Sequence, residues 1–485
     1  MLVEERSAAI QMPQAPSGTA LVRGRPHAGP LVLVAACLAL AGVSLLLPSA
    51  PTYDPWSWII WGREIAHLDL VTTLGPSWKP LPVLFTTVFS FFGPAAPALW
   101  LVVARAGALA AVFFAYRVAR RLGGGIVGGV AAAAALAIAP WWIRNAALGN
   151  SEGLIVAFVL AAVDRELAGR RDVAFAMAVC AGLLRPEAWP FLAAYSVFLM
   201  WRRALPVRVV LGAGIVVLAL WLLPEWWGSG DLWRAAHRAK NVNPGAPTFA
   251  DNPALQTLHN AGGMLTAPLH VGLAAAAVML VVARHRVVAA LVVISIAWLG
   301  LVAYMTEDGF SGNQRYLMAP MALLMVLSGS GAGWLLGHIA ERVRAGVTRP
   351  GAGGPAGVAV AAVAVGLAFM VPSFGRFVPN LHAIKYQADL ANELPGLVAA
   401  AGGAEALKRC GDPYTGPFMV PVVAWNLHVH TMEVQVDPVP PAVVFRERTT
   451  AGARLVPSVR GVANRRKLAA GARWRIVAQC GSGAG

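Results

Sequence analysis

Charged residues are scarce in this 485-residue sequence, and their scarcity excludes an ordinary soluble protein. Asp, Glu, Lys and Arg together make up 13% of the chain, whereas a soluble domain carries about 25%. Hydrophobic residues make up 58%, and the mean hydropathy is +0.62. The composition therefore predicts a membrane protein with many spanning segments.

Lysine is especially scarce, because the 39 basic residues comprise 34 Arg and 5 Lys. A net charge of +16 would suit nucleic-acid binding if the cations were gathered on one face. The arginines are instead scattered between apolar runs, where positive charge sets the orientation of spanning segments. We therefore expect membrane lipids as partners and no nucleic acid.

Cysteine is also sparse, with four residues in the chain. Cys37 and Cys180 lie inside apolar runs, whereas Cys410 and Cys480 lie in the polar C-terminal part. Extracytoplasmic domains permit disulfides, so we expect a Cys410–Cys480 bond if this part lies outside. The alternative is two free thiols in a small core.

Long apolar runs are plentiful, and eleven of them are candidates to cross about 30 Å of hydrocarbon. The first could be a signal peptide, but Pro48 stands where cleavage requires a small residue, which favours an uncleaved span. The runs cover residues 31–47, 98–116, 125–143, 151–164, 173–184, 187–201, 207–223, 267–283, 287–305, 316–338 and 357–372.

The loops between these runs alternate in charge. With a cytoplasmic N-terminus every inner loop is short and basic, as the positive-inside rule requires. The inner cations are Arg23, Arg25, Arg117, Arg120, Arg121, Arg165, Arg170, Arg171, Arg202, Arg203, Arg208, Arg284, Arg286, Arg342, Arg344 and Arg349, and most acidic residues fall in outer loops. An odd number of spans then places the C-terminus outside the plasma membrane.

Three regions follow from this pattern. Residues 1–30 form a polar, disordered cytoplasmic N-terminus, residues 31–372 form the transmembrane domain, and residues 373–485 form an extracytoplasmic domain. In that domain, residues 380–411 have helical spacing with a Gly-Gly break, whereas residues 418–436 and 472–481 favour extended segments. The predicted fold class is an all-α polytopic membrane protein of about eleven transmembrane helices, with interfacial helices in the first outer loop and a small α/β C-terminal domain.

The first outer loop holds Asp54, four tryptophans (at 56, 58, 61 and 78) and Lys79. We expect two helices lying in the membrane interface with tryptophan at headgroup level. Asp54 precedes Pro55, which favours a helix N-cap, but it could also serve as a general base. Lys79 could be a cation that reaches the interface or a contact to a lipid phosphate.

Other polar residues interrupt the apolar runs at the same outer level. Ionisable groups at membrane depth are costly and usually mark a cavity or a pathway. The structural alternative is that two such residues form an ion pair that links helices, as Arg144 and Glu152 could. The residues are Arg105, Arg144, Asn145, Asn150, Ser151, Glu152, Arg185, Glu187, Glu307, Asp308, Asn313, Gln314 and Arg315.

Five segments, taken in order, resemble the GT-C glycosyltransferases, and most closely the branch of protein mannosyltransferases and lipid A aminoarabinose transferases. The resemblance covers roughly residues 31–340 and depends on the order and spacing of the segments. They are "WKPLPVLFTTVFSFFG" (78–93), "RVARRLGG" (117–124), "WIRNAALGNSEGLIVAFVLAAV" (142–163), "AGLLRPEAWPFLAAY" (181–195) and "NQRYLMAPMALLMVLSG" (313–329).

The resemblance implies a function and roles for residues. Members of this family move a sugar from a polyprenyl-phosphate donor to a protein, glycan or lipid hydroxyl at the outer membrane face. Asp54 takes the place of the family's base, Glu152 of its second acid, and Lys79 and Arg315 of residues that contact the donor. Arg144, Arg185 and Tyr316, in the matched segments, are further candidates for binding donor phosphate or substrate.

Two departures bear on cofactors and on the outer domain. The family's acidic pair in the first outer loop is a lone Asp54 here, so the sequence does not support a bound divalent metal. The C-terminal domain matches no known carbohydrate-binding module. The pair His428 and His430, predicted to share one face of a strand, lacks a further ligand pattern.

The predicted function is therefore a polyprenyl-phosphate-dependent glycosyltransferase of the cell envelope, with mannose or arabinose as the expected sugar. A transporter of lipid-linked sugars would be expected to have inverted repeats and broken helices, and no repeat is apparent. A non-catalytic membrane scaffold whose outer domain binds a partner is the other alternative.

Overall fold

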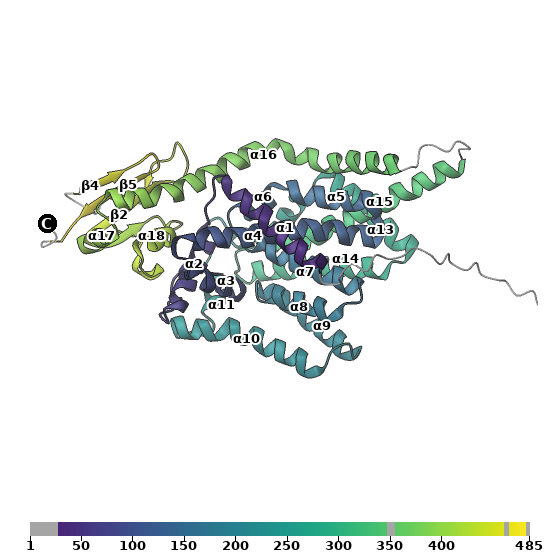
Figure 1. Ribbon diagram of the computed structural model, residues 1–485, viewed down its shortest axis with the longest axis horizontal. Helices are drawn as coiled ribbons and strands as arrows, with labels where there is room; N and C mark the ends of the chain where they lie inside the picture. Colours follow the sequence, from purple (N-terminus) through teal and green to yellow (C-terminus); the bar gives the residue numbers. More distant parts are fainter. Residues whose placement is uncertain (1–27, 347–354, 460–464, 482–485) are drawn as a thin grey trace, which may run out of the picture.

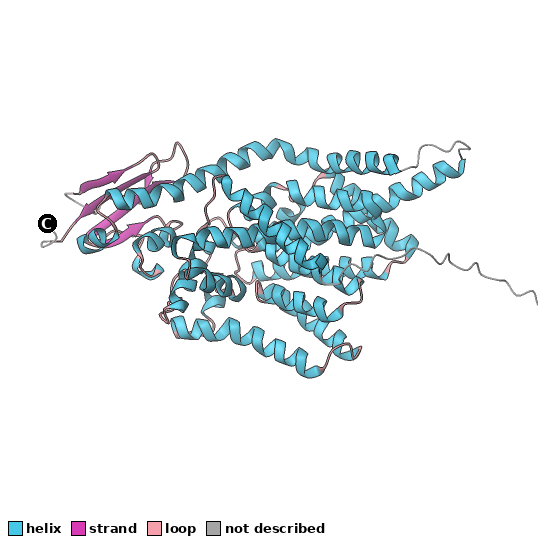
Figure 2. Ribbon diagram, viewed as in Figure 1, coloured by secondary structure: helices cyan, strands magenta, loops and turns pink. Residues whose placement is uncertain are grey.

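The computed structural model describes residues 28–346, 355–459 and 465–481. Nearly all of the predicted N-terminal region (1–30) lies outside the described residues, as do residues 347–354 between the last two predicted apolar runs. Helices make up most of the molecule, and a small sheet lies at one end of the helical bundle (Figures 1 and 2).

Each of the eleven predicted apolar runs overlaps a helix, and the run 125–143 extends past the break at Ala139 into the next helix. In the described part of the chain, six helical stretches are long and apolar enough to cross a membrane, or eight if two bent pairs each count as one span. The helices are α1 (Ala28–Val43), α4 (Ala96–Ala119), α5 (Gly125–Ile138), α7 (Glu152–Leu167), α8 (Arg171–Gly182), α9 (Trp189–Trp201), α10 (Val207–Ser229), α13 (Ala267–Ala283), α14 (Arg286–Glu307), α15 (Met318–Gly346) and α16 (Pro355–Ala400).

The two bent pairs join a short helix to a longer one. Helix α6 (Pro140–Ala147) meets α7 at 112°, and α12 (Pro253–Gly262) meets α13 at 97°. At the first bend Gly149 has φ +75° and lies against Trp100, whose indole donates to the Gly149 carbonyl at 2.8 Å. A side chain at Gly149 would be strained by this φ and by the contact, so glycine permits the bend between α6 and α7.

The first outer loop forms two helices that pack directly on each other. Helix α2 (Tyr53–Ala66) crosses α3 (Pro80–Ser90) at Gly62, where an added Cβ would lie 2.4 Å from the Thr86 backbone. The Thr86 hydroxyl donates to the Trp58 carbonyl at 2.6 Å. This close approach fixes the position of α2.

The four tryptophans of this loop lie inside the protein. None of the four is more than 9% exposed. The Trp61 indole donates to the Val71 carbonyl at 3.1 Å, and the Trp78 indole donates to the Leu220 carbonyl at 3.0 Å. Because the N–H groups of Trp61 and Trp78 are satisfied inside the protein, these two rings can fill its interior.

A buried carboxylate, Asp164, forms ion pairs with arginines near the C-terminal ends of α4 and α7. The Asp164 side chain is fully buried and pairs with Arg117 at 3.2 Å, with Arg121 at 3.1 Å and with Arg165. Paired burial of this kind is the condition for placing a carboxylate away from water. The basic loops predicted to face the cytoplasm are thereby tied to the bundle.

Helix α16 runs along one side of the bundle and continues into the C-terminal domain (Figure 1). The domain boundary expected at residue 373 therefore falls inside one continuous helix. After the predicted Gly-Gly break, where Gly402 and Gly403 have positive φ, comes α17 (Ala404–Cys410). A disulfide joins Cys410 to Cys480 across a sequence separation of 70.

The C-terminal sheet has five strands in the order β1-β2-β5-β4, with β3 paired to β2. The β1–β2 pair is parallel and the other pairs are antiparallel. The strand predicted within residues 472–481 is confirmed as β5. The strands are β1 (Asp412–Thr415), β2 (Ala442–Arg448), β3 (Leu455–Val456), β4 (Arg466–Ala470) and β5 (Trp474–Gln479).

The extended structure predicted for residues 418–436 is wrong over its first half. That half forms helix α18 (Val420–Leu427), which packs on α2. Its valines favour a strand by propensity, but tertiary packing overrides such preferences. His428 ends the helix with φ +56°, so His428 and His430 do not share one face of a strand.

Loss of the disulfide should loosen the C-terminal sheet. Cross-linking residues so far apart in sequence stabilises a domain by about 2–4 kcal/mol. In Cys410→Ser we expect the free energy of opening, measured by hydrogen exchange in β2 and β5 of the full-length protein in detergent, to fall by about 2–4 kcal/mol. Cys180→Ser, which removes a thiol outside any disulfide, is the control, and equal protection in both variants would contradict the prediction.

Candidate active site

Polar residues from five segments meet at the end of the bundle that carries the C-terminal sheet, where Figure 1 shows α2, α3 and α11 (Arg234–Lys240). The segments are far apart in sequence, and each ends or begins a helix there. They contribute Asp54 at the start of α2, Lys79 before α3, Asn150 to Glu152 at the α6–α7 bend, Arg185 and Glu187 after α8, and Arg315 and Tyr316 in a 3-10 turn (Gln314–Leu317) before α15.

Asp54 does not occupy the N-cap position of α2, so the capping interpretation is wrong. Thr52 is the N-cap residue, and Asp54 lies in the first helical turn. One Asp54 carboxylate oxygen accepts a hydrogen bond from the Arg315 guanidinium at 2.8 Å. The Asp54 side chain remains 17% exposed, so the carboxylate can meet a substrate.

Arg315 reaches Asp54 because the chain turns sharply before α15. The Asn313 side chain accepts from the Arg315 backbone N–H at 3.0 Å and so caps this turn. The guanidinium also donates to the Asn150 side-chain oxygen at 3.2 Å, and Thr52 donates to the same oxygen at 3.1 Å. Asn150 thus bridges Arg315 and the start of α2 and fixes their relative positions.

Glu152 is the buried centre of the cluster. Its side chain is fully buried, pairs with Arg185 and lies 3.8 Å from the Lys79 ammonium. Arg185 also lies 3.4 Å from Glu187 and stacks over the Tyr316 ring at 4.5 Å. The partner of Glu152 is therefore Arg185 and not Arg144, which is exposed and lies outside the cluster.

Lys79 is held between polar and aromatic groups. Its ammonium donates to the Ser151 hydroxyl at 3.0 Å and lies 5.0 Å from the centre of the Trp58 ring. Burial, and next the charge of Arg185, lower the pKa of Lys79 to about 8. An anion bound beside the ammonium would stabilise its charged form.

The residues around Asp54 do not fit a divalent metal. Such an ion takes several oxygen ligands from carboxylates, carbonyls and waters. The partner of the Asp54 carboxylate is a guanidinium, which repels a metal cation instead of sharing it. Among the described residues, no group of three or more His, Cys, Asp or Glu side chains could hold a metal ion.

A second buried ion pair positions Lys79, and sequence reasoning missed it. Arg234 of α11 pairs with Glu225 of α10 at 3.1 Å and donates to the Pro76 carbonyl at 3.0 Å. It thereby fixes the loop that leads to Lys79. Glu225 gave a signal, because a carboxylate in an apolar helix requires a partner, but nothing in the spacing pointed to Arg234.

Arg105, one of the predicted polar intrusions, is structural. Its guanidinium donates to the Ser44 carbonyl at 3.0 Å, to the Ser49 hydroxyl at 2.8 Å and to the Ala147 carbonyl at 2.7 Å. Arg105 therefore ties the end of α1 to α6 and stays outside the cluster.

This helical bundle, with a polar cluster at one end and a small C-terminal sheet, has the fold of two solved structures of ArnT. It is similar to ArnT from Cupriavidus metallidurans bound to undecaprenyl phosphate, with a TM-score of 0.58 and 16% identity over 93% of this chain and 97% of that one. ArnT in the apo state gives a TM-score of 0.55 with 16% identity, over 93% and 98% of the two chains. No protein-family model and no curated sequence matches this chain.

The two carboxylates of the cluster should differ in their effect on stability. Glu152→Gln leaves buried Lys79 without its counter-charge and leaves Arg185 with Glu187 alone, and breaking such a buried pair costs about 3–5 kcal/mol. Asp54→Asn removes a partly exposed pair, worth about 1 kcal/mol or less. We expect a clearly lower thermal unfolding midpoint in detergent for Glu152→Gln only. Equal midpoints for the two variants would show that Glu152 does not hold the cluster together.

Proposed function

We propose that this chain is an integral-membrane glycosyltransferase that moves a sugar from a polyprenyl-phosphate donor to an acceptor hydroxyl of the cell envelope. The observation that carries the proposal is the contact of Asp54 with Arg315, beside Lys79, in a chain with the ArnT fold. Fold alone does not define a reaction, but this cluster supplies both a proton acceptor and cations for a phosphate.

The reaction is a single displacement at the anomeric carbon. The acceptor oxygen forms a bond to C1 of the sugar while the bond from C1 to the phosphate oxygen breaks. The polyprenyl phosphate leaves with the electron pair, and the proton of the acceptor hydroxyl passes to the Asp54 carboxylate. A positioned base contributes about 10²–10⁴-fold to such a step, and one displacement inverts the configuration at C1.

Lys79 and Arg315 are the proposed contacts of the donor phosphate. Cations fixed where negative charge develops stabilise the transition state, and charge-assisted bonds to phosphate are strong. A phosphate that draws the Arg315 guanidinium away would free the Asp54 oxygen to accept from the acceptor hydroxyl. Glu152, Arg185 and Tyr316 are proposed to position Lys79 and Arg315.

The proposed topology has eleven spans, a cytoplasmic N-terminus and an extracytoplasmic C-terminal domain in the plasma membrane. The charge alternation of the loops supports this orientation. Helices α2 and α3, which carry Asp54 and follow Lys79, lie toward the C-terminal sheet (Figure 1), and this supports chemistry at the outer face in the proposed orientation. Mannose and arabinose are the proposed sugars.

Asp54→Asn should abolish transfer while leaving the fold intact. Membranes containing the wild type, given radiolabelled polyprenyl-phosphate mannose or arabinose, should pass label to envelope fractions, and Asp54→Asn should do so about 10²–10⁴-fold more slowly. Asp172→Asn, on an exposed aspartate of α8, is the control and should match the wild type. Equal transfer by wild type and Asp54→Asn would remove Asp54 as the base. An inactive wild type would favour a scaffold or a transporter.

The dependence of transfer on pH should report on Lys79. Its pKa of about 8 means that the ammonium is charged below this pH and discharged above it. Donor binding should therefore weaken as the pH rises through about 8. In Lys79→Arg the side chain stays charged across this range, so the fall should disappear. KM for the donor, measured between pH 6.5 and 9.5, checks this, and identical profiles in the two proteins would contradict it.

A further inference from the structure

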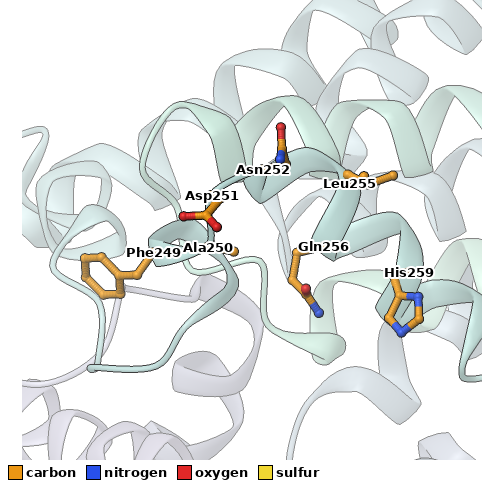
Figure 3. A pocket seen from close by; sticks show the side chains of 7 residues that line it. All are labelled: Phe249, Ala250, Asp251, Asn252, Leu255, Gln256 and His259. Atoms are coloured by element: carbon orange, nitrogen blue, oxygen red, sulfur yellow. The ribbon is translucent and has the colours of Figure 1, made fainter.

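The second long outer loop, between α10 and α13, carries a polar hollow on α12. Its volume is about 730 Å³, within the range of about 300–1,000 Å³ found for ligand pockets. Figure 3 shows Gln256 and His259 on α12, with Phe249, Asp251 and Asn252 in the turn that leads into the helix.

A second hollow of about 430 Å³ lies between this loop and the segment that leads to Arg315. Its polar lining residues are Asn243, Asn260, Ser311, Asn313 and Gln314. Asn313 and Gln314 immediately precede Arg315, which contacts Asp54. This hollow therefore borders the proposed active site.

The two hollows adjoin along one helix. Gln256 lines the first, Asn260 lines the second, and the Gln256 amide donates to the Asn260 oxygen at 3.0 Å. These residues are one turn apart on α12, which places them on one face. Together the hollows make a track that leads away from Arg315.

The track is fixed to the end of α14 by several contacts. Lys240 pairs with Asp308 at 2.7 Å, the Thr248 hydroxyl donates to the Thr306 carbonyl at 2.9 Å, and the Thr257 hydroxyl donates to that of Thr306 at 3.1 Å. A binding surface held in place before the ligand arrives loses less entropy on binding.

The lining chemistry suits hydroxyl groups and not phosphate. Carboxamides offer both donors and acceptors, as sugar hydroxyls require, and the 64% exposed Phe249 ring offers a flat apolar face. Among the described residues that line the two hollows there is no Lys or Arg, although phosphate recognition relies on these cations. Asp251 adds a negative charge that would repel an anionic acceptor.

We propose that the two hollows form one binding track for an uncharged glycan chain of several sugar units, whose terminal hydroxyl is the acceptor. This inference rests on the proposed function and narrows its acceptor class from any envelope hydroxyl to an extended neutral glycan. The units behind the terminal one lie along Asn260 and Gln256 and hold the chain in place for transfer.

The test measures transfer to manno- and arabino-oligosaccharides of one, three and six units by the full chain in nanodiscs. The wild type should prefer the six-unit over the one-unit acceptor of one series, by the ratio of kcat/KM. Gln256→Ala combined with His259→Ala removes two polar contacts and should lower that ratio about tenfold. His270→Ala, an exposed histidine on α13, is the control and should keep the wild-type ratio.

A second measurement separates this inference from the proposed function. Fluorescent six-unit oligosaccharides of both series are bound to the wild type and the double variant without donor. Transfer with no preference for length, a preference for a phosphorylated acceptor, or a variant effect on donor KM alone would overturn the track while the transferase stands. Binding that the double variant loses, with no transfer by the wild type, would keep the glycan site and overturn the transferase. Neither binding nor transfer would overturn both.

Discussion

The site depends on the requirement that each charge buried at the end of the bundle near the C-terminal sheet be neutralised by another. Glu152, which is fully buried, supplies the negative charge that compensates for the burial of Arg185 and Lys79. Isolated ions inside a protein cost several kcal/mol each. Because five segments contribute to the cluster, the same pairing that satisfies these charges also fixes the relative positions of the helix ends that carry Asp54 and Arg315.

Helix α2, which carries Asp54, is held from two sides. Gly62 brings it against α3, and the C-terminal domain contacts it through His430, which lies 2.8 Å from Glu64. Burial raises the pKa of Glu64, and although burial itself opposes charge on His430, its hydrogen bond to Glu64 raises the pKa of His430 overall. The C-terminal domain thus supports the helix that bears the proposed base, without lining the cluster itself.

The sequence was informative where a polar residue interrupts an apolar run, because such an interruption is costly and therefore visible. Asp54, Lys79, Glu152, Arg185 and Arg315 were all singled out on this ground, and the structure brings them together. The partners could not be predicted: Arg144 was matched to Glu152 in place of Arg185, and the pairing of Arg234 with Glu225 depends on how distant segments pack. Helix α18 was misjudged for the same reason, since its packing against α2 outweighs the strand propensity of its valines.

The most direct measurement is an experimental structure of the chain in nanodiscs with undecaprenyl phosphate, the species a polyprenyl donor leaves behind. The phosphate should lie within hydrogen-bonding distance of the Lys79 ammonium and the Arg315 guanidinium, with Arg315 withdrawn from Asp54. A phosphate bound elsewhere, with the Asp54–Arg315 contact unchanged, would contradict the assignment of this cluster as the active site.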